Sequence, residues 1–406
     1  MVSDVRSLLE AHGKPEREVY LDNENSGWVP PEVVEAMLPY FNEVGYGHPS
    51  ITNRPGWEAL EVLQETSELV ASTIGCEPAS VHFTHSGTEA NNLAIVGAAL
   101  GNRDSGRKVV ISAAEHMSVI MPAESLREAG FEVVKVPVDG EGFVDLDALA
   151  SSIDSETILV SIHAVNHEIG TIQRIREISE VVRDKNGDVI IHTDACDAYG
   201  RLPLRVDDIG VDLMTLSSHK ILGPKGVGVL YVAEGVRLRP VLRGALSSEP
   251  LWPGVENVPA LAGFKKAVEL AFRDLDGQNS RVRRLRDRLM DSIMSEVPDV
   301  LLNGPREERA PDNLNVSFLY VEGEALTIEL SLRGVYVSSG SACTSRVLEP
   351  SHVLLAIGRR HEEAHGSILF KLTRYHTEED IDYVASQVPE AVERLRRLSP
   401  LGKAKE

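Results

Sequence analysis

The sequence predicts an α/β fold with a mostly parallel sheet wrapped by helices, followed by a smaller α+β domain. Strand and helix patterns alternate from Val81 to Val232, as repeated strand–helix units require. One strand, residues 157–162, is strongly apolar on both faces, which is typical of a sheet covered on both sides. After about Leu261 the alternation gives way to long amphipathic helices among isolated strands. A chain of 406 residues also favours two domains.

The part of the chain before the alternation predicts one strand and two helices. Residues 18–22 form the strand. The prolines at 30–31 suit a first helical turn, so a helix is expected from there to Tyr40. Residues 57–74 carry apolar side chains at helical spacing, and Gly75 is the expected end of that helix.

The alternating region predicts seven strands and four helices. The strands are residues 81–84, 108–112, 132–136, 157–162, 189–193, 211–216 and 227–232, and the helices are 89–100, 117–129, 145–152 and 175–183.

The C-terminal part has a different pattern of helices and strands, and the boundary between the two domains is expected at residues 250–259. Its helices are predicted at 264–275, 280–297, 325–333 and 378–398, and its strands at 313–318, 335–337 and 368–372.

Composition excludes several classes of protein. A formal net charge of −21 argues against a nucleic-acid binder, which needs a basic surface. The sequence has no apolar run long enough to span a bilayer, and its N-terminus has no signal-peptide core. Cys76, Cys196 and Cys343 lie far apart without metal-ligand spacing. We therefore expect no metal site and a reducing, cytoplasmic location.

Polar side chains follow five of the predicted strands. Because ligands gather at the carboxyl ends of parallel strands, these side chains are candidates for one site. They are Ser86-Gly87-Thr88, Glu115-His116, the group His163, Asn166, His167 and Glu168, then Asp194, and finally Ser217-Ser218-His219-Lys220.

The chemistry of this set matches pyridoxal phosphate. A lysine such as Lys220, held against apolar strands, can become a neutral amine that forms a Schiff base with an aldehyde. Asp194 can pair with a pyridinium nitrogen, while N–H and hydroxyl groups before a helix can bind phosphate. A lone lysine is usually a surface residue, and Ser or Thr before a helix is usually only a cap. Because five strand ends carry such groups together, a cofactor site is favoured over these ordinary interpretations.

The motifs resemble those of the NifS-like cysteine desulfurases, in the class V aminotransferase group of pyridoxal-phosphate enzymes. The resemblance runs from Tyr20 to Arg397. The motifs that carry it are residues 86–92 (SGTEANN), 114–116 (AEH), 168–173 (EIGTIQ), 192–195 (HTDA), 218–226 (SHKILGPKG) and 338–343 (SSGSAC).

The resemblance implies the fold type I of pyridoxal-phosphate-dependent transferases, with a large domain built on a seven-stranded type of sheet. It further implies three parts. Residues 1–25 pack with the small domain, residues 26–258 form the large cofactor-binding domain, and residues 259–406 form the small α+β domain with the catalytic cysteine loop.

The resemblance also implies a role for each matching residue. Lys220 would hold the cofactor as a Schiff base and later move the substrate proton. Asp194 would pair with the pyridine nitrogen, and His116 would stack on the ring and act as an acid or base. Cys343, in the small-residue loop 338–345, would be the nucleophile. The phosphate would be bound by Gly87, Thr88, Ser218 and His219.

Four positions depart from the family pattern. Asp197 replaces a glutamine that contacts the cofactor ring oxygen, and His167 replaces a cofactor-contacting asparagine. Val255 stands where a threonine reaches the partner subunit's phosphate. Leu369 stands where many members keep the arginine that binds the substrate carboxylate, with Arg374 a few residues further on.

The implied activity is removal of sulfur from L-cysteine, which gives L-alanine and a persulfide on Cys343. The sulfur would pass to an iron–sulfur scaffold or another acceptor protein, and the enzyme would be a homodimer. Because the carboxylate anchor is replaced, a selenocysteine lyase or another β-elimination or aminotransfer enzyme is the alternative. A non-enzymatic sulfur-transfer platform is the third hypothesis.

Overall fold

The computed structural model describes residues 13–244, 251, 253–339 and 350–398. The chain divides into two compact units, each described here by itself. The larger unit consists of Ser26–His167 and Thr171–Leu275. The smaller unit consists of Met1–Asn25, Glu168–Gly170 and Asp276–Glu406.

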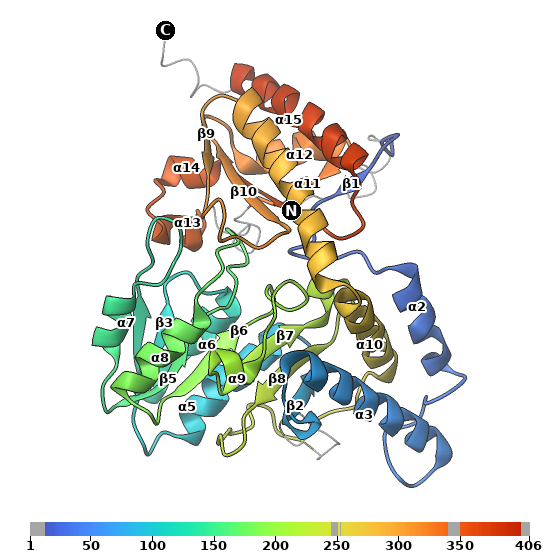
Figure 1. The fold of residues 1–406 in the computed structure, drawn as a ribbon, viewed down its shortest axis with the longest axis vertical. Helices are drawn as coiled ribbons and strands as arrows, with labels where there is room; N and C mark the ends of the chain where they lie inside the picture. The colour runs from blue at the N-terminus through green and yellow to red at the C-terminus, as the bar shows by residue number, and fades with distance from the viewer. Residues whose placement is uncertain (1–12, 245–250, 252, 340–349, 399–406) are drawn as a thin grey trace. The chain divides into compact units, whose positions relative to one another are not determined.

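The larger unit is built on a seven-stranded sheet in the order β2-β8-β7-β6-β5-β3-β4 (Figure 1). Only β8 runs antiparallel to its neighbours, so the predicted mostly parallel sheet is confirmed. The strands are β2 (Val81–Thr84), β3 (Lys108–Ser112), β4 (Glu132–Val136), β5 (Thr157–Ser161), β6 (Ile190–Asp194), β7 (Leu213–Ser217) and β8 (Gly228–Val232).

Helices follow most of these strands. They are α2 (Pro31–Met37), α3 (Arg54–Ile74), α4 (Gly87–Asn92), a π-helical turn (Leu93–Gly97), α5 (Ala98–Gly101), α6 (Met117–Ser125), α7 (Leu146–Ser152), α8 (Ile175–Lys185), α9 (Val206–Ile209) and α10 (Val258–Phe272). Short 3₁₀ turns are η1 (Leu38–Phe41), η2 (Pro78–Ser80), η4 (Leu126–Ala129) and η5 (Ser218–Ile221). The four-residue helix α9 was not predicted, because one helical turn is too short to show a period.

Local sequence explains where these helices begin and end. Helix α3 starts at Asn53, whose side chain accepts a hydrogen bond from Gly56 N, and stops at Gly75 with φ 73°. Helix α8 buries Ile175, Ile178 and Val182, one stripe at helical spacing. Residues of α4, the π-helical turn, α5 and α6 share a core with β3, β5, β7 and β8. This core holds the strand ends in register.

The boundary between the units lies further along the chain than residue 258, where the sequence analysis placed it. Helix α10 packs on α2 and α3, so the larger unit continues to Leu275. Ala267, Val268 and Ala271 are buried in α10, and that burial is why the helix belongs with the larger unit.

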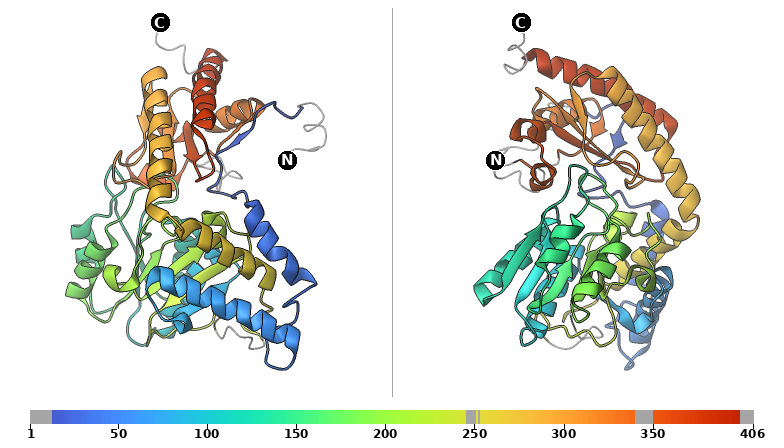
Figure 2. Two further views of the ribbon diagram at one scale, coloured as in Figure 1. Left: turned by 45° about the vertical axis from the view of Figure 1, so that its right-hand side comes forward. Right: turned by 60° about the vertical axis from the view of Figure 1, so that its left-hand side comes forward.

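The smaller unit joins a three-stranded antiparallel sheet, β12-β10-β9, to a two-stranded parallel pair, β1-β11. Helices α11 and α15 contribute buried side chains to the apolar core of the smaller unit (Figure 2). The elements are β1 (Val19–Tyr20), α11 (Leu275–Glu296), β9 (Val300–Leu302), β10 (Asn313–Phe318), α12 (Gly323–Leu332), β11 (Val335–Tyr336), α13 (His352–Ala356), α14 (His361–His365), β12 (Ser367–Lys371) and α15 (Glu378–Leu398). The sequence analysis missed β9, α13 and α14, each of five residues or fewer.

The N-terminal segment belongs to the smaller unit, since β1 pairs with β11 and Leu21 is fully buried in the same core. Within the described ranges, no helix is both long enough and apolar enough to cross a membrane.

Candidate active site

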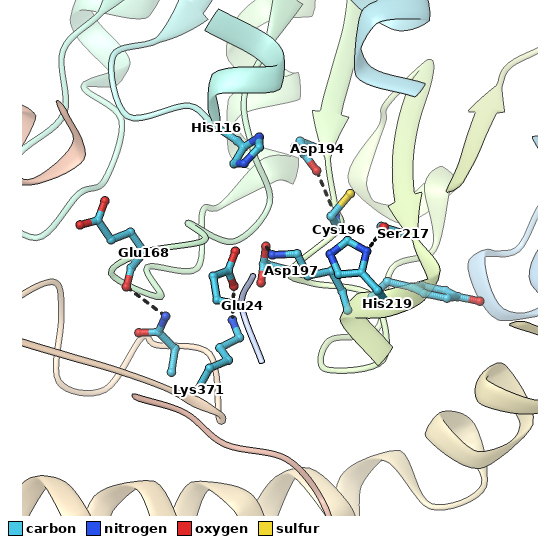
Figure 3. Close-up of polar contacts among 12 residues, drawn as sticks. Glu24, His116, Glu168, Asp194, Cys196, Asp197, Ser217, His219 and Lys371 are labelled. Atoms are coloured by element: carbon cyan, nitrogen blue, oxygen red, sulfur yellow. Dashed lines mark hydrogen bonds and ion pairs between the residues drawn. The ribbon is translucent and has the colours of Figure 1, made fainter. Parts of the chain in front are cut away.

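The strand ends that carry the predicted site residues meet at one edge of the larger unit's sheet. Strands β2, β3, β5, β6 and β7 point the same way, because β8 lies between β2 and β7 and is antiparallel to both. Their carboxyl ends present all nine residues that the family resemblance assigns to the cofactor. These are Gly87, Thr88, His116, His167, Asp194, Asp197, Ser218, His219 and Lys220. Figure 3 shows part of this group.

Lys220 lies in the 3₁₀ turn η5, directly after β7, and its side chain is only 9% exposed. Its Nζ is 3.0 Å from Asp197 Oδ2, so the two form a buried ion pair. Arg201 donates a hydrogen bond to the Lys220 carbonyl oxygen at 3.0 Å, which fixes the backbone of the turn. The turn ends at Leu222, whose φ of 69° is in the left-handed region. The amine is therefore held at one place beside a carboxylate.

Asp194 ends β6 and is itself held by two donors. Its Oδ1 accepts from Cys196 N at 3.0 Å, and its Oδ2 accepts from Asn91 Nδ2 at 2.7 Å. These two N–H donors fix both carboxylate oxygens of Asp194 in place.

His116 is the N-cap residue of α6, and its Nδ1 accepts a hydrogen bond from Ser118 N at 3.1 Å. Its ring meets the ring of His167 edge-on, with centroids 4.9 Å apart and an interplanar angle of 86°. The substitution of His167 for the family's asparagine therefore places a second imidazole against the first.

A candidate anion-binding corner lies where α4 begins next to η5. Ser86 caps α4 and accepts from Glu89 N, while the first N–H groups of a helix have no partner inside it. Gly87 is required for this approach, because a Cβ there would lie 2.8 Å from Cys196 Sγ. Ser218 Oγ is buried without a hydrogen-bond partner among the described residues.

His219 adds a neutral ring to the same corner. Its Nδ1 is 2.8 Å from Ser217 Oγ (Figure 3), and burial, with the nearby Lys220 charge, lowers the pKa of His219 to about 4. A neutral imidazole offers one N–H donor and adds no charge to the site.

These features fit pyridoxal phosphate. The residues offer an amine for its aldehyde, a fixed carboxylate for its ring nitrogen and an imidazole for its ring face. The unpartnered Ser218 hydroxyl and the α4 N-terminus are suited to its phosphate. Asp197 is the exception, since a carboxylate next to the ring's phenolic oxygen would repel it unless a proton lies between them.

Sequence reasoning missed several residues under this edge. Cys196 is buried next to Gly87, and burial with the neighbouring Asp194 raises the pKa of its thiol well above the usual value. Burial lowers the pKa of His192 to about 4, and the ring is fixed between Ser161 and Thr215. Asn91 and Ser118, which contact Asp194 and His116, had no assigned role. The His116-x-Ser118 spacing at a helix start was the only sequence signal for Ser118.

The other residues that the sequence analysis named lie outside these strand ends in the sequence. Cys343 lies in residues 340–349, outside the described part of the chain. Val255 is 74% exposed in the larger unit. Leu369 is buried in β12 of the smaller unit, and Arg374 packs over the Tyr375 ring there. Among the described residues, no cluster of three or more His, Cys, Asp or Glu side chains is arranged to hold a metal ion.

Comparison with known proteins defines the class. The family model described as aminotransferase class-V matches residues 19–384, so the chain belongs to this family. Pyridoxal phosphate is the cofactor of the family as a whole, and the predicted transferase fold is confirmed.

The relatives narrow this to the cysteine desulfurases. Cysteine desulfurase IscS 1 of Archaeoglobus fulgidus is 45% identical over 382 residues, which are 94% of this chain and 99% of that protein. A solved NifS-like protein is similar with a TM-score of 0.87 and 33% identity, covering 93% of this chain and all of its own. SspA, solved in complex with cysteine, has a TM-score of 0.77 and 29% identity over 89% of this chain and 100% of its own. The resemblance predicted from the motifs is confirmed.

Proposed function

We propose that the chain is a pyridoxal-phosphate-dependent cysteine desulfurase that converts L-cysteine to L-alanine and keeps the sulfur as a persulfide on Cys343. The observation that carries the proposal is the buried Lys220 at the strand edge it shares with Asp194 and His116. Full-length similarity to cysteine desulfurases supports the reaction.

When bound, the cofactor supplies an electron sink for the carbanion formed at the substrate α-carbon. Lys220 would hold the cofactor through its Nζ, and the same amine, when free, would take and return the substrate α-proton. Asp194, whose carboxylate is fixed by Cys196 N and Asn91, would pair with the ring nitrogen. When Lys220 is not bound to the cofactor, its ammonium group pairs with Asp197.

Sulfur leaves through Cys343. Its thiolate attacks the substrate sulfur, an S–S bond forms, and the carbon–sulfur bond breaks with its electron pair left on carbon. That carbon takes up a proton, and alanine is released. Cys196 does not suit this step, because its thiol is buried and its pKa is raised, so the thiolate is scarce.

We further propose that the enzyme is a cytoplasmic homodimer that passes sulfur to an iron–sulfur scaffold or another acceptor protein. Relatives bearing the IscS name support the first kind of acceptor. Cys76 and Cys196 are both free thiols, as a reducing compartment would keep them.

The test is an assay of the purified protein with L-cysteine and a reductant. Alanine and sulfide should appear in equal amounts, and Cys343→Ser should abolish sulfide release while leaving the yellow cofactor bound. Cys76→Ser is the matched control and should keep activity. Sulfide release that survives Cys343→Ser would contradict the role of Cys343.

A second substrate remains a specific alternative, because Leu369 presents a buried apolar side chain where many relatives keep an arginine. Selenocysteine and other β-substituted amino acids should therefore be compared with cysteine by kcat/KM. A higher value for another amino acid would assign the chain to a related lyase or aminotransferase.

A further inference from the structure

A continuous chain of hydrogen bonds joins Asp194 to His116 through two residues with no assigned role. Asn91 Nδ2 lies 2.7 Å from Asp194 Oδ2 and 2.8 Å from Ser118 Oγ. Ser118 Oγ lies 2.7 Å from His116 Nδ1. The four residues come from α4, the end of β6 and the start of α6, so only the fold brings them together.

The direction of each hydrogen bond follows from Asp194. Its carboxylate can only accept, so Asn91 must turn its NH₂ group toward it. A flipped amide would place Asn91 Oδ1 against the carboxylate and is excluded by repulsion. Asn91 is 1% exposed, so water cannot relieve the wrong orientation.

The second amide hydrogen of Asn91 then determines the state of His116. It occupies a lone pair of Ser118 Oγ, and the hydroxyl hydrogen is left to point at His116 Nδ1. The backbone N–H of Ser118 points at the same nitrogen. With two donors facing it, Nδ1 has no room for a proton of its own, and a neutral imidazole must carry its hydrogen on Nε2.

We propose that Asn91 and Ser118 are positioning residues that hold His116 as the neutral Nε2–H tautomer, with the charge of Asp194 setting the direction of the chain. His116 then offers a hydrogen-bond donor to the reacting groups and is not their base, which leaves proton transfer to Lys220. The role in catalysis rests on the proposed function, whereas the tautomer is a property of the chain without cofactor or substrate.

The tautomer is read by long-range ¹H–¹⁵N NMR of cofactor-free protein labelled on histidine nitrogen. The chain has 13 histidines, so the His116 signals are assigned by their loss in His116→Gln. We expect a bare, hydrogen-bonded Nδ1 and a protonated Nε2 near neutral pH. A proton found on Nδ1 would overturn the proposal.

Variants then test the two positioning residues. Ser118→Ala should move the Nδ1 signal toward that of a free acceptor, and Ser118→Thr should restore it because the hydroxyl returns. Ser125→Ala is the matched control on the same helix, since the Ser125 hydroxyl bonds only the Pro122 carbonyl among the described contacts. An unmoved signal in Ser118→Ala would overturn the role of Ser118.

The transmission of the Asn91 hydrogen bond through Ser118 to His116, here called the relay, has its own test, because Asn91 does not touch His116. Asn91→Leu should move the same Nδ1 signal in the same direction by a smaller amount, since the Ser118 hydroxyl would be free to rotate. No movement in a folded Asn91→Leu protein would overturn the relay.

Kinetics distinguish a donor from a base. His116→Gln keeps an N–H donor on a side chain of similar reach and should retain more of kcat than His116→Ala, while Ser118→Ala should lower kcat by about fivefold, as for one lost hydrogen bond. Equal kcat values in the two His116 variants would overturn the donor role. Failure of the desulfurase assay itself would leave the NMR results standing, so the two proposals fail separately.

Discussion

Two buried lysines, one in each unit, show that burial alone does not identify a functional residue. Lys220 is 9% exposed and pairs with one carboxylate, Asp197, at 3.0 Å. Lys371 is fully buried, with Glu24 at 3.4 Å and Asp312 at 3.9 Å from its Nζ. Both satisfy the rule that a buried charge needs a partner.

The sheets that carry the two lysines differ. Lys220 follows the carboxyl end of β7 in a mostly parallel sheet, and ligands gather at that edge in such sheets. Lys371 is the last residue of β12 in an antiparallel sheet, where it pairs with Asn313 of β10, and its two carboxylates lie in the same unit. We therefore expect Lys220 to take part in the chemistry and Lys371 to stabilise the smaller unit.

The largest expected effect comes from Lys220→Ala. Loss of covalent attachment and of the proton carrier should lower kcat for alanine formation by at least about 10³-fold. The visible absorbance of lysine-bound cofactor should disappear, while circular dichroism stays native. A variant that keeps this absorbance after gel filtration would contradict the assignment.

Lys371→Met should act on stability instead. It leaves Glu24 and Asp312 without their buried cation, at a cost of about 3–5 kcal/mol in the free energy of unfolding. Urea denaturation measures the loss, and adding Glu24→Gln to the variant should recover part of it. If Lys371→Met kept full stability but lost cysteine turnover, Lys371 would belong to the active site after all.

Glu168, in the smaller unit, should make that unit sensitive to alkali. Burial and the nearby Glu24 raise its pKa to about 8, against the effect of a 2.5 Å hydrogen bond from Ser351. A raised pKa stabilises the fold fully below pH 4.5, and the contribution is lost as pH rises through about 8. The loss is about 5 kcal/mol. Glu168→Gln should flatten the dependence of unfolding free energy on pH in this range.

The larger unit should show the opposite sensitivity. Burial lowers the pKa of His192 and of His219 to about 4 from 6.5. The unfolded chain therefore binds more protons between these values, and stability present above pH 6.5 is lost as pH falls toward 4. Each histidine contributes about 3 kcal/mol. Urea denaturation of cofactor-free protein at pH 4.5 and 7 measures this, and His192→Asn should remove about half of the difference. If the unfolding free energies of the original protein and of His192→Asn differed by the same amount between pH 4.5 and 7, the role of His192 would be contradicted.

The smallest effect is expected for Asp197→Asn. Its carboxylate favours the protonated form of Lys220, and only the neutral amine attacks an aldehyde. Cofactor-free Asp197→Asn should therefore react with pyridoxal phosphate about tenfold faster at neutral pH. Stopped-flow absorbance measures the rate. An unchanged rate would mean that the ion pair does not control this lysine.

The sequence was most informative where the pattern is local. Strands such as residues 108–112 and 132–136 were predicted residue for residue, because their apolar runs end at polar turns. The candidate cofactor residues meet at one edge because each follows a strand, and strand ends in a parallel sheet share an edge; their roles stay a prediction. Short elements such as β9 and α14 were missed, because they are set by packing and not by their own period.

By itself, the sequence predicted the fold class, singled out Lys220 and identified the polar groups at the strand ends. Periodicity and motif spacing can be read along a single chain, which is why these features were accessible. Only the tertiary structure decided which carboxylate meets Lys220, that Asn91 and Ser118 link Asp194 to His116, and that α10 belongs to the larger unit. Lys220 and Asp197 lie 23 residues apart in the sequence, and Asn91 lies 27 residues from Ser118 and 103 from Asp194. Hydrogen-bond direction and burial are properties of neighbours in space, and no local pattern records them.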